Sequence, residues 1–214
     1  MSLLNILLSN DRAEVYVDTA ARLAPGLPDD LARAMPSCCE MSKLFWVAEC
    51  NTVLAGRGNP AFMSLVASAT LARFGDGFEG LVRAMPGILE ERAAAYVGLL
   101  TQAGVDAAAF QAQEVAVVGW SEETGAMAAL IYVREGGAPA FEALTLPCAE
   151  SWLAPWFESM GPMPDRLEPV RAAMLAADQV AQMREHAPQA AIGGRLLRAT
   201  LTRDECSMRE VCRL

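Results

Sequence analysis

The chain has 214 residues, 53% of them hydrophobic and 20% charged, which suits one large folded domain with a substantial core. Its net charge of −9 and pI of about 4.7 argue against binding to nucleic acid or to an anionic membrane surface, since both need a clustered basic face. No apolar run approaches the roughly 18 residues that cross a bilayer, so we expect a cytoplasmic protein without membrane contacts.

The N-terminal part predicts a β-hairpin. Leu3 to Leu8 is a short apolar run typical of a buried strand, and Ala13 to Thr19 alternates as a second strand does. Asn10-Asp11 between them is a turn signal. The stretch at about 24–41 follows and is rich in proline, and we interpret it as an insertion within a single domain spanning 1–214 rather than as a linker.

The middle of the chain predicts two more strands and then two helices. The strands are expected at Lys43 to Val47 and Asn51 to Leu54. Asn59 is a good N-cap with Pro60 at the first helical position, so a helix is predicted over Ala61 to Phe74. A second helix is predicted over Pro86 to Gln102, ended by Gly104.

The C-terminal half predicts a return to strands, interrupted by one long amphipathic helix. The expected elements are strands at Glu114 to Trp120, Ala126 to Val133 and Ala140 to Leu146, a helix over Leu167 to His186, and strands at Leu196 to Thr202 and Met208 to Leu214. Runs of strands separated by helices indicate a layered α+β fold, because a doubly wound parallel sheet would need regular βαβ alternation.

One basic residue is unusual in this composition. Lys43 is the only lysine among seventeen basic residues, the others being arginines. Asp18 lies upstream at the end of a predicted strand, and Ser2 follows the initiator methionine. A hydroxyl, a carboxylate and an ammonium brought together would be suited to nucleophilic catalysis.

These residues and their surroundings resemble β-type subunits of the proteasome and its bacterial relatives, within the N-terminal-nucleophile (Ntn) hydrolases. The matching text comprises Ser2 to Asp18 without a gap, Ser42-Lys43-Leu44-Phe45 and Ala55-Gly56-Arg57-Gly58. It extends weakly to Ala116 to Val133 and to the turn at Ile192-Gly193-Gly194. The resemblance implies a four-layer αββα sandwich, a peptide or amide substrate, and a homo-oligomer or ring.

The resemblance also implies a role for each site residue. Removal of Met1 would expose Ser2, whose hydroxyl would attack an amide while its own α-amino group acts as general base. That amine has an ordinary pKa of about 7.7–8.0, which suits proton transfer near neutral pH. Lys43 would keep the amine neutral, Asp18 would pair with Lys43, and the Gly56 N–H would stabilise the oxyanion.

The sequence departs from the family pattern near its end. The family usually places an aspartate and a serine just before the Gly-Gly turn, where this chain has Gln189 and Ile192. A glycine- and serine-rich loop is also replaced by Pro147-Cys148-Ala149-Glu150-Ser151, in which Ser151 is at best a partial substitute. These departures leave open a catalytically inactive structural or assembly protein that keeps the fold.

Each candidate also has a plain structural interpretation. Ser2 could be an ordinary terminal residue, Asp18 could cap the end of its strand, and Lys43 could be solvated. Gly56 could simply permit a tight turn.

Two other site types fit the sequence poorly. Gly56 to Ala61 matches a dinucleotide-binding fingerprint, but the strand with an acidic end that should follow is replaced by a turn and a helix. Cys38, Cys39 and Cys50 lack the spacing of zinc ligands. We therefore expect neither a cofactor nor a metal.

Overall fold

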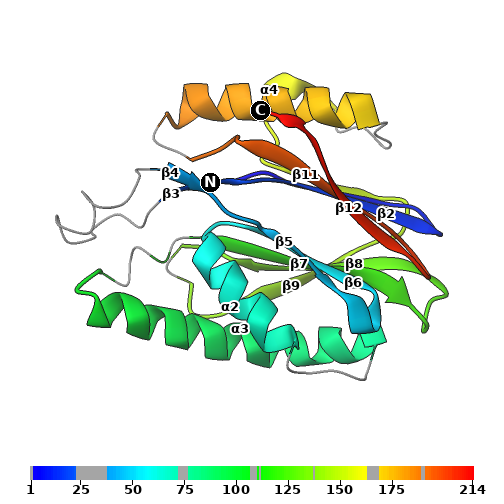
Figure 1. Ribbon diagram of the computed structural model, residues 1–214, viewed down its shortest axis with the longest axis horizontal. Helices are drawn as coiled ribbons and strands as arrows, with labels where there is room; N and C mark the ends of the chain where they lie inside the picture. Colours follow the sequence, from blue (N-terminus) through cyan, green and yellow to red (C-terminus); the bar gives the residue numbers. More distant parts are fainter. Residues whose placement is uncertain are drawn as a thin grey trace.

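The computed structural model describes residues 2–22, 38–71, 77–106, 110, 112–136, 138–162, 169–188 and 191–214 (Figure 1). Two five-stranded antiparallel sheets dominate these residues. The first sheet has the order β10-β1-β2-β11-β12, formed by Ser151–Ala154, Leu4–Leu8, Arg12–Asp18, Arg195–Thr202 and Cys206–Arg213. The second has the order β5-β6-β7-β8-β9, formed by Leu44–Val47, Thr52–Arg57, Gln113–Ser121, Ala126–Arg134 and Glu142–Leu146.

The predicted hairpins are present. In the first sheet β1 pairs with β2 so that Leu4 lies opposite Val17, and the Ser9 N–H donates to the Arg12 carbonyl at 2.8 Å to close the turn. In the second sheet β7 and β8 pair from Gln113 opposite Arg134 to Ser121 opposite Ala126. In both hairpins the two predicted strands are therefore adjacent and antiparallel, as the short turns between them require.

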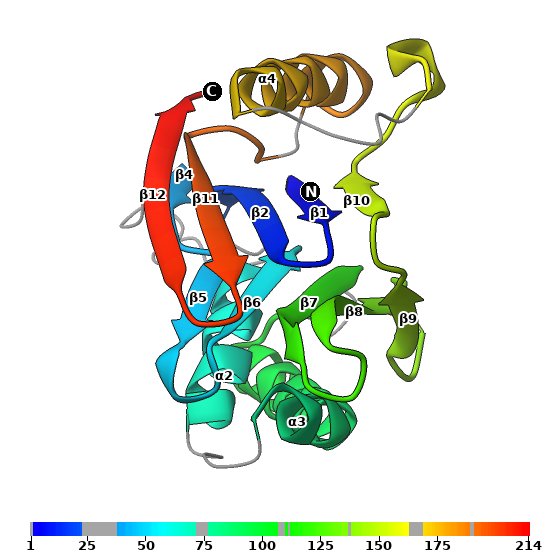
Figure 2. The same cartoon turned by 90° about the vertical axis from the view of Figure 1, so that its right-hand side faces the viewer.

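The sheets pack face to face, and helices lie on their outer faces (Figures 1 and 2). Apolar residues between the sheets include Ile6, Val15, Val118, Ile131 and Ala199. Helix α4 (Pro169–His186) covers part of the first sheet, while α2 (Pro60–Leu71) and α3 (Gly77–Gln102) cover the second. The pattern confirms the predicted α+β class, and a helix is present at each of the three predicted places in the chain.

The start of α2 confirms the capping prediction. Asn59 Oδ1 accepts hydrogen bonds from the N–H groups of Ala61 (2.9 Å) and Phe62 (3.1 Å), two of the donors that a helix N-terminus leaves unsatisfied. Pro60 is the first helical residue, where its missing N–H costs nothing. The cap matters for the site below because it fixes the path of the chain immediately after β6.

Helix α3 begins earlier than predicted, since it runs through Pro86 instead of starting there. A proline inside a helix has no N–H to donate, so the carbonyl four residues earlier, on Val82, loses its partner. The Tyr132 hydroxyl, reaching from β8, donates to that carbonyl at 3.1 Å. This tertiary contact explains why the helix tolerates a residue that sequence reasoning takes as a helix start.

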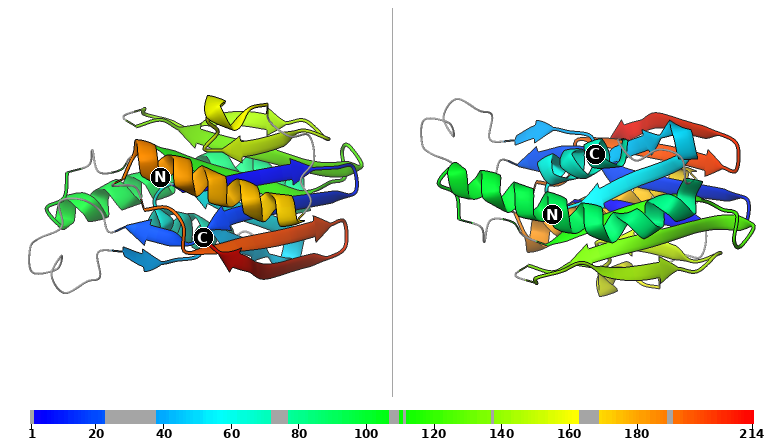
Figure 3. Two further views of the ribbon diagram at one scale, coloured as in Figure 1. Left: turned by 90° about the horizontal axis from the view of Figure 1, so that it is seen from above. Right: turned by 90° about the horizontal axis from the view of Figure 1, so that it is seen from below.

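The prediction of a four-layer αββα sandwich is wrong. The described residues contain three α-helices, and one outer face carries α4 alone (Figure 3, left). Between β9 and α4 the described chain forms the strand β10 and the 3-10 turn Glu158–Met160 instead of another helix. Pro155 and Gly161 interrupt this stretch, and both residue types disfavour helix interiors. The architecture is a pair of antiparallel sheets with unequal helical cover.

A small two-stranded sheet was not predicted. It pairs β3 (Ala20–Arg22) with β4 (Cys38–Glu40), directly after β2 and before β5. The proline-rich insertion predicted at about 24–41 lies mainly outside the described residues, which resume at Cys38. The 3-10 turn Ala48–Cys50 joins β5 to β6.

Candidate active site

Asp18 is the best-anchored residue of the predicted site. It ends β2 and is fully buried. Its Oδ1 accepts the Leu3 N–H at 2.8 Å and the Lys43 ammonium at 3.0 Å, and its Oδ2 accepts the Gly193 N–H at 3.1 Å. Both oxygens are therefore bound, so this carboxylate acts as a fixed negative charge that orients its neighbours.

Lys43 supplies the matching positive charge. It stands just before β5, and none of its side chain is exposed. Besides Asp18, its Nζ donates to the Ala20 carbonyl at 2.6 Å. Because β2 and β5 belong to different sheets, this ion pair joins the two sheets at one end of the molecule. The predicted pairing of Asp18 with Lys43 is thus present, and the interpretation of Lys43 as solvated is wrong.

Ser2 lies beside this pair. It is 2% exposed, and both ends of the peptide unit that follows it are held. The N–H of that unit, on Leu3, shares Asp18 Oδ1 with the Lys43 ammonium, while its carbonyl, on Ser2, accepts from Arg57 Nε at 2.8 Å. The backbone at Ser2 is thereby fixed next to the buried ammonium. Met1 lies outside the described residues.

Gly56 has a clear packing role. A Cβ at this position would lie 2.2 Å from Met63 Sδ, so only glycine lets the side chain from α2 pack this closely against β6. Its N–H donates to the Lys43 carbonyl at 2.9 Å as part of the pairing between β5 and β6. An oxyanion would have to compete with that bond. The role predicted for this N–H stays a prediction.

The turn before β11 contributes a backbone contact to Asp18 through Gly193. Gly193 and Gly194 have φ values of 116° and 78°, and a Cβ on Gly194 would lie 2.8 Å from Thr19 Oγ1. Ile192 is buried in the core under α4, and Gln189 lies outside the described residues. At this turn the backbone N–H of Gly193 contacts Asp18.

Ser151 is not brought to this site. It pairs with Leu7 on β1, five residues along the strand from Ser2, which corresponds to roughly 16 Å of strand rise. The suggestion that it partly replaces the missing loop finds no support in its position.

Sequence reasoning missed Arg57, which contacts Ser2, and two residues linked to it by hydrogen bonds. Arg57, in β6, binds the Ser2 carbonyl and forms an ion pair with Glu114 of β7. Glu114 also accepts from Trp152 Nε1 of β10 at 3.4 Å. The sequence signal for Arg57 was a charged residue at the end of a largely apolar strand. Its partner Glu114 could be identified only from the pairing of β6 with β7.

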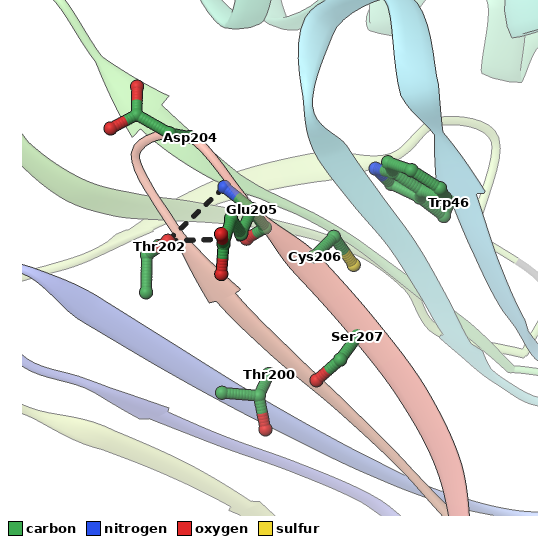
Figure 4. A pocket seen from close by; sticks show the side chains of 7 residues that line it. All are labelled: Trp46, Thr200, Thr202, Asp204, Glu205, Cys206 and Ser207. Carbon is green, nitrogen blue, oxygen red and sulfur yellow. Dashed lines mark hydrogen bonds between the residues drawn. The ribbon is translucent and has the colours of Figure 1, made fainter.

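A cavity lies far from Ser2. A cavity of about 350 Å³ lies between β5 and the hairpin of β11 and β12, lined by Trp46, Thr200, Thr202, Asp204, Glu205, Cys206 and Ser207 (Figure 4). Thr202 is six residues beyond Leu196, the residue opposite Asp18, which is roughly 20 Å of strand rise. The cavity contains none of the predicted catalytic residues.

The described residues contain no group of three or more His, Cys, Asp or Glu that could hold a metal ion. The side chains of Cys38 and Cys39 lie outside this description, while Cys50 Sγ contacts the Val47 carbonyl at 3.8 Å. Among the described helices, none combines the length and apolar character needed to cross a bilayer.

Comparison with solved structures identifies similar folds. A Gly-1 mutant of Anbu from Hyphomicrobium sp. strain MC1 superposes with a TM-score of 0.61, over 99% of this chain and 88% of that one, at 10% identity. Anbu, described as an ancestral beta-subunit, from Yersinia bercovieri gives a TM-score of 0.58 with the same coverage and identity. The fold is proteasome-like.

The comparisons also correct the sequence-based resemblance. No sequence family matches this chain, and no curated protein is similar to it in sequence. The predicted membership of the β-type proteasome subunits of the Ntn hydrolases is therefore wrong, because the similar solved structures are Anbu proteins at 10% identity. Similarity at that level establishes a shared fold and nothing about activity.

Proposed function

We propose that this protein is an amide or peptide hydrolase whose nucleophile is Ser2, exposed by removal of Met1. The observation that carries the proposal is the fully buried pair of Asp18 and Lys43, which shares an oxygen with the amide next to Ser2. Burying two charges costs several kcal/mol per ion before pairing, and apolar replacements of such pairs are often no less stable. A buried pair beside Ser2 is therefore better explained by chemistry than by stability.

The reaction would proceed in two steps, in which the acyl group of the substrate is transferred first to Ser2 and then to water. The Ser2 hydroxyl attacks the substrate carbonyl carbon, and its proton moves to the free α-amino group of the same residue. The tetrahedral intermediate collapses to an ester on Ser2 as the protonated amine transfers its proton to the departing nitrogen. Water, activated by the same amine, then attacks the ester, releases the carboxylic acid and restores Ser2.

The buried pair would assist this chemistry electrostatically. The Lys43 ammonium stabilises negative charge developing on the Ser2 oxygen and lowers the pKa of the α-amino group, so more of that group is the neutral base. Asp18 keeps Lys43 charged and holds the Leu3 amide in place. The substrate is expected to be a peptide or another amide.

A non-catalytic structural or assembly protein is the competing function. Two observations favour it: the Gly56 N–H already donates to the Lys43 carbonyl, and Ile192 is packed into the core where a polar residue would be expected. Intact mass separates the possibilities at the first step. Loss of one methionine from most molecules is required for the hydrolase, and retention of Met1 would favour the structural role.

Labelling with a β-lactone tests the nucleophile. Wild-type protein should gain one adduct on Ser2, and Ser2→Ala should gain none. Ser68→Ala is a matched control, because Ser68 is an exposed serine on α2. If Ser2→Ala were labelled like the wild type and Ser68→Ala, Ser2 would not be the nucleophile.

A further inference from the structure

The peptide unit between Ser2 and Leu3 forms hydrogen bonds with charged side chains through both its N–H and its carbonyl. Its N–H donates to Asp18 from the first sheet, and its carbonyl accepts from Arg57 of the second. A strand-end peptide normally bonds to neighbouring backbone. Here two ionised side chains from different sheets determine where the first side chain of the processed protein lies.

Arg57 is itself held from two directions. Its guanidinium donates through Nε to the Ser2 carbonyl and through Nη1 to Glu114, so its fork contacts two partners at once. Glu114 lies opposite Arg57 in the pairing of β6 with β7 and also accepts from Trp152 of β10. The Arg57 and Glu114 side chains are only 19% and 13% exposed, so solvent screens the pair weakly.

We propose that Arg57 is a positioning residue for the Ser2 nucleophile. Glu114 partly compensates the positive charge of Arg57 near the Ser2 α-amino group. This inference rests on the proposed function. The carbonyl that Arg57 binds belongs to the same residue as the hydroxyl and the amine, so this bond helps to fix the position of the Cα atom from which both groups project. A displacement of about 1 Å in such a site can reduce the rate by roughly 100-fold.

The charges predict opposite effects for the two partners. Arg57→Met removes a positive charge near the α-amino group and leaves Glu114 unpaired, so the pKa of the amine should rise. Glu114→Gln removes the compensating negative charge, so the pKa of the amine should fall. Nearby charges typically move a pKa by about one unit or more. A purely structural role for the pair would not produce opposite signs.

The experiment measures β-lactone labelling of the processed protein against pH and reagent concentration. Arg57→Met should lower the limiting rate by about 10- to 100-fold with little change in reagent affinity, and should move the pH midpoint upward. Glu114→Gln should move the midpoint downward. Arg57→Lys keeps the charge without the fork, so it should restore the midpoint but not the rate. Arg203→Met, in an exposed pair with Glu122, is the matched control and should behave as wild type.

A second measurement needs no activity. Exchange of the Leu3 amide with deuterated water, followed by NMR, should be faster in Arg57→Met than in Arg203→Met if Arg57 fixes this peptide. Unchanged labelling rate and midpoint in Arg57→Met, with wild type labelled normally, would overturn the positioning role and leave Ser2 as nucleophile. Absence of labelling in processed wild type would instead overturn the proposed function, and the positioning role with it.

Discussion

At the scale of single residues, the site depends on a carboxylate that has no unused oxygen. Asp18 binds the Leu3 amide, the Lys43 ammonium and the Gly193 amide. Lys43 also binds the Ala20 carbonyl. Each of these contacts joins segments far apart in sequence, so the pair fixes the terminus, the first sheet and the second sheet relative to one another.

Replacing one member of the ion pair of Asp18 and Lys43 should destabilise the protein more than replacing both. Lys43→Met leaves Asp18 charged and buried, and we expect a loss of about 3–5 kcal/mol in the free energy of unfolding. Asp18→Asn combined with Lys43→Met leaves no buried charge and should lose clearly less. Urea unfolding of both variants measures the difference. A double variant less stable than the single one would show that Asp18 contributes mainly through its two backbone contacts.

Two cysteines should differ in reactivity. Burial raises the pKa of the Cys206 thiol to about 11, so little thiolate is present near pH 8.5, whereas Cys148 is exposed. Iodoacetamide should therefore modify Cys148 at least about tenfold faster than Cys206, as measured by peptide mass over time. Similar rates at both sites would mean that β12 opens readily from the sheet.

At the scale of elements, α3 depends on a contact from the sheet that it covers. Pro86 leaves the Val82 carbonyl without a helical donor, and Tyr132 supplies one. At the start of α2, the Asn59 side chain accepts hydrogen bonds from two N–H groups that have no partner within the helix. Sequence patterns predicted the cap because its partners are local. They misplaced the start of α3 because the donor to the Val82 carbonyl lies fifty residues away in β8.

Tyr132→Phe should reveal this contact. It leaves the Val82 carbonyl unsatisfied, so we expect a loss of about 1–2 kcal/mol in unfolding free energy at pH 7. Pro86→Ala restores a helical donor, so the same Tyr132→Phe change should cost less in that background. Urea unfolding of the two single variants and the double variant completes the cycle. Strictly additive losses would argue against the contact.

The same variant has a predicted pH dependence. Burial raises the pKa of Tyr132 to about 12 from an ordinary value of 10, so the folded protein keeps a proton that the unfolded chain loses first. The stability linked to that proton is fully present below pH 10 and is lost as the pH rises from 10 to 12, by about 1.4 kcal/mol per pH unit. The deficit of Tyr132→Phe should therefore shrink above pH 10.

At the scale of the whole molecule, each of the two large sheets ends in edge strands, β10 and β12 in the first and β5 and β9 in the second. The edge strand β12 is largely exposed, and Trp46 and Met208 present apolar surface near the edges of the two sheets. We expect these exposed edges to mediate self-association. Light scattering at several concentrations should give a multiple of the 22.9 kDa chain mass, and a constant 22.9 kDa would contradict the expectation.

The sequence by itself determined the local structure of this protein. Hydrophobic patterns, turn residues and the Asn59 cap depend on neighbours within a few positions, so most strands and helices were predictable. The sequence also singled out Ser2, Asp18 and Lys43 as candidate site residues. Tertiary structure alone decided which of these groups meet. It also decided that Gly193 contacts Asp18, that Arg57 contacts Ser2, and that α4 covers the first sheet. Those outcomes depend on contacts between residues up to 175 positions apart, and no local pattern encodes them.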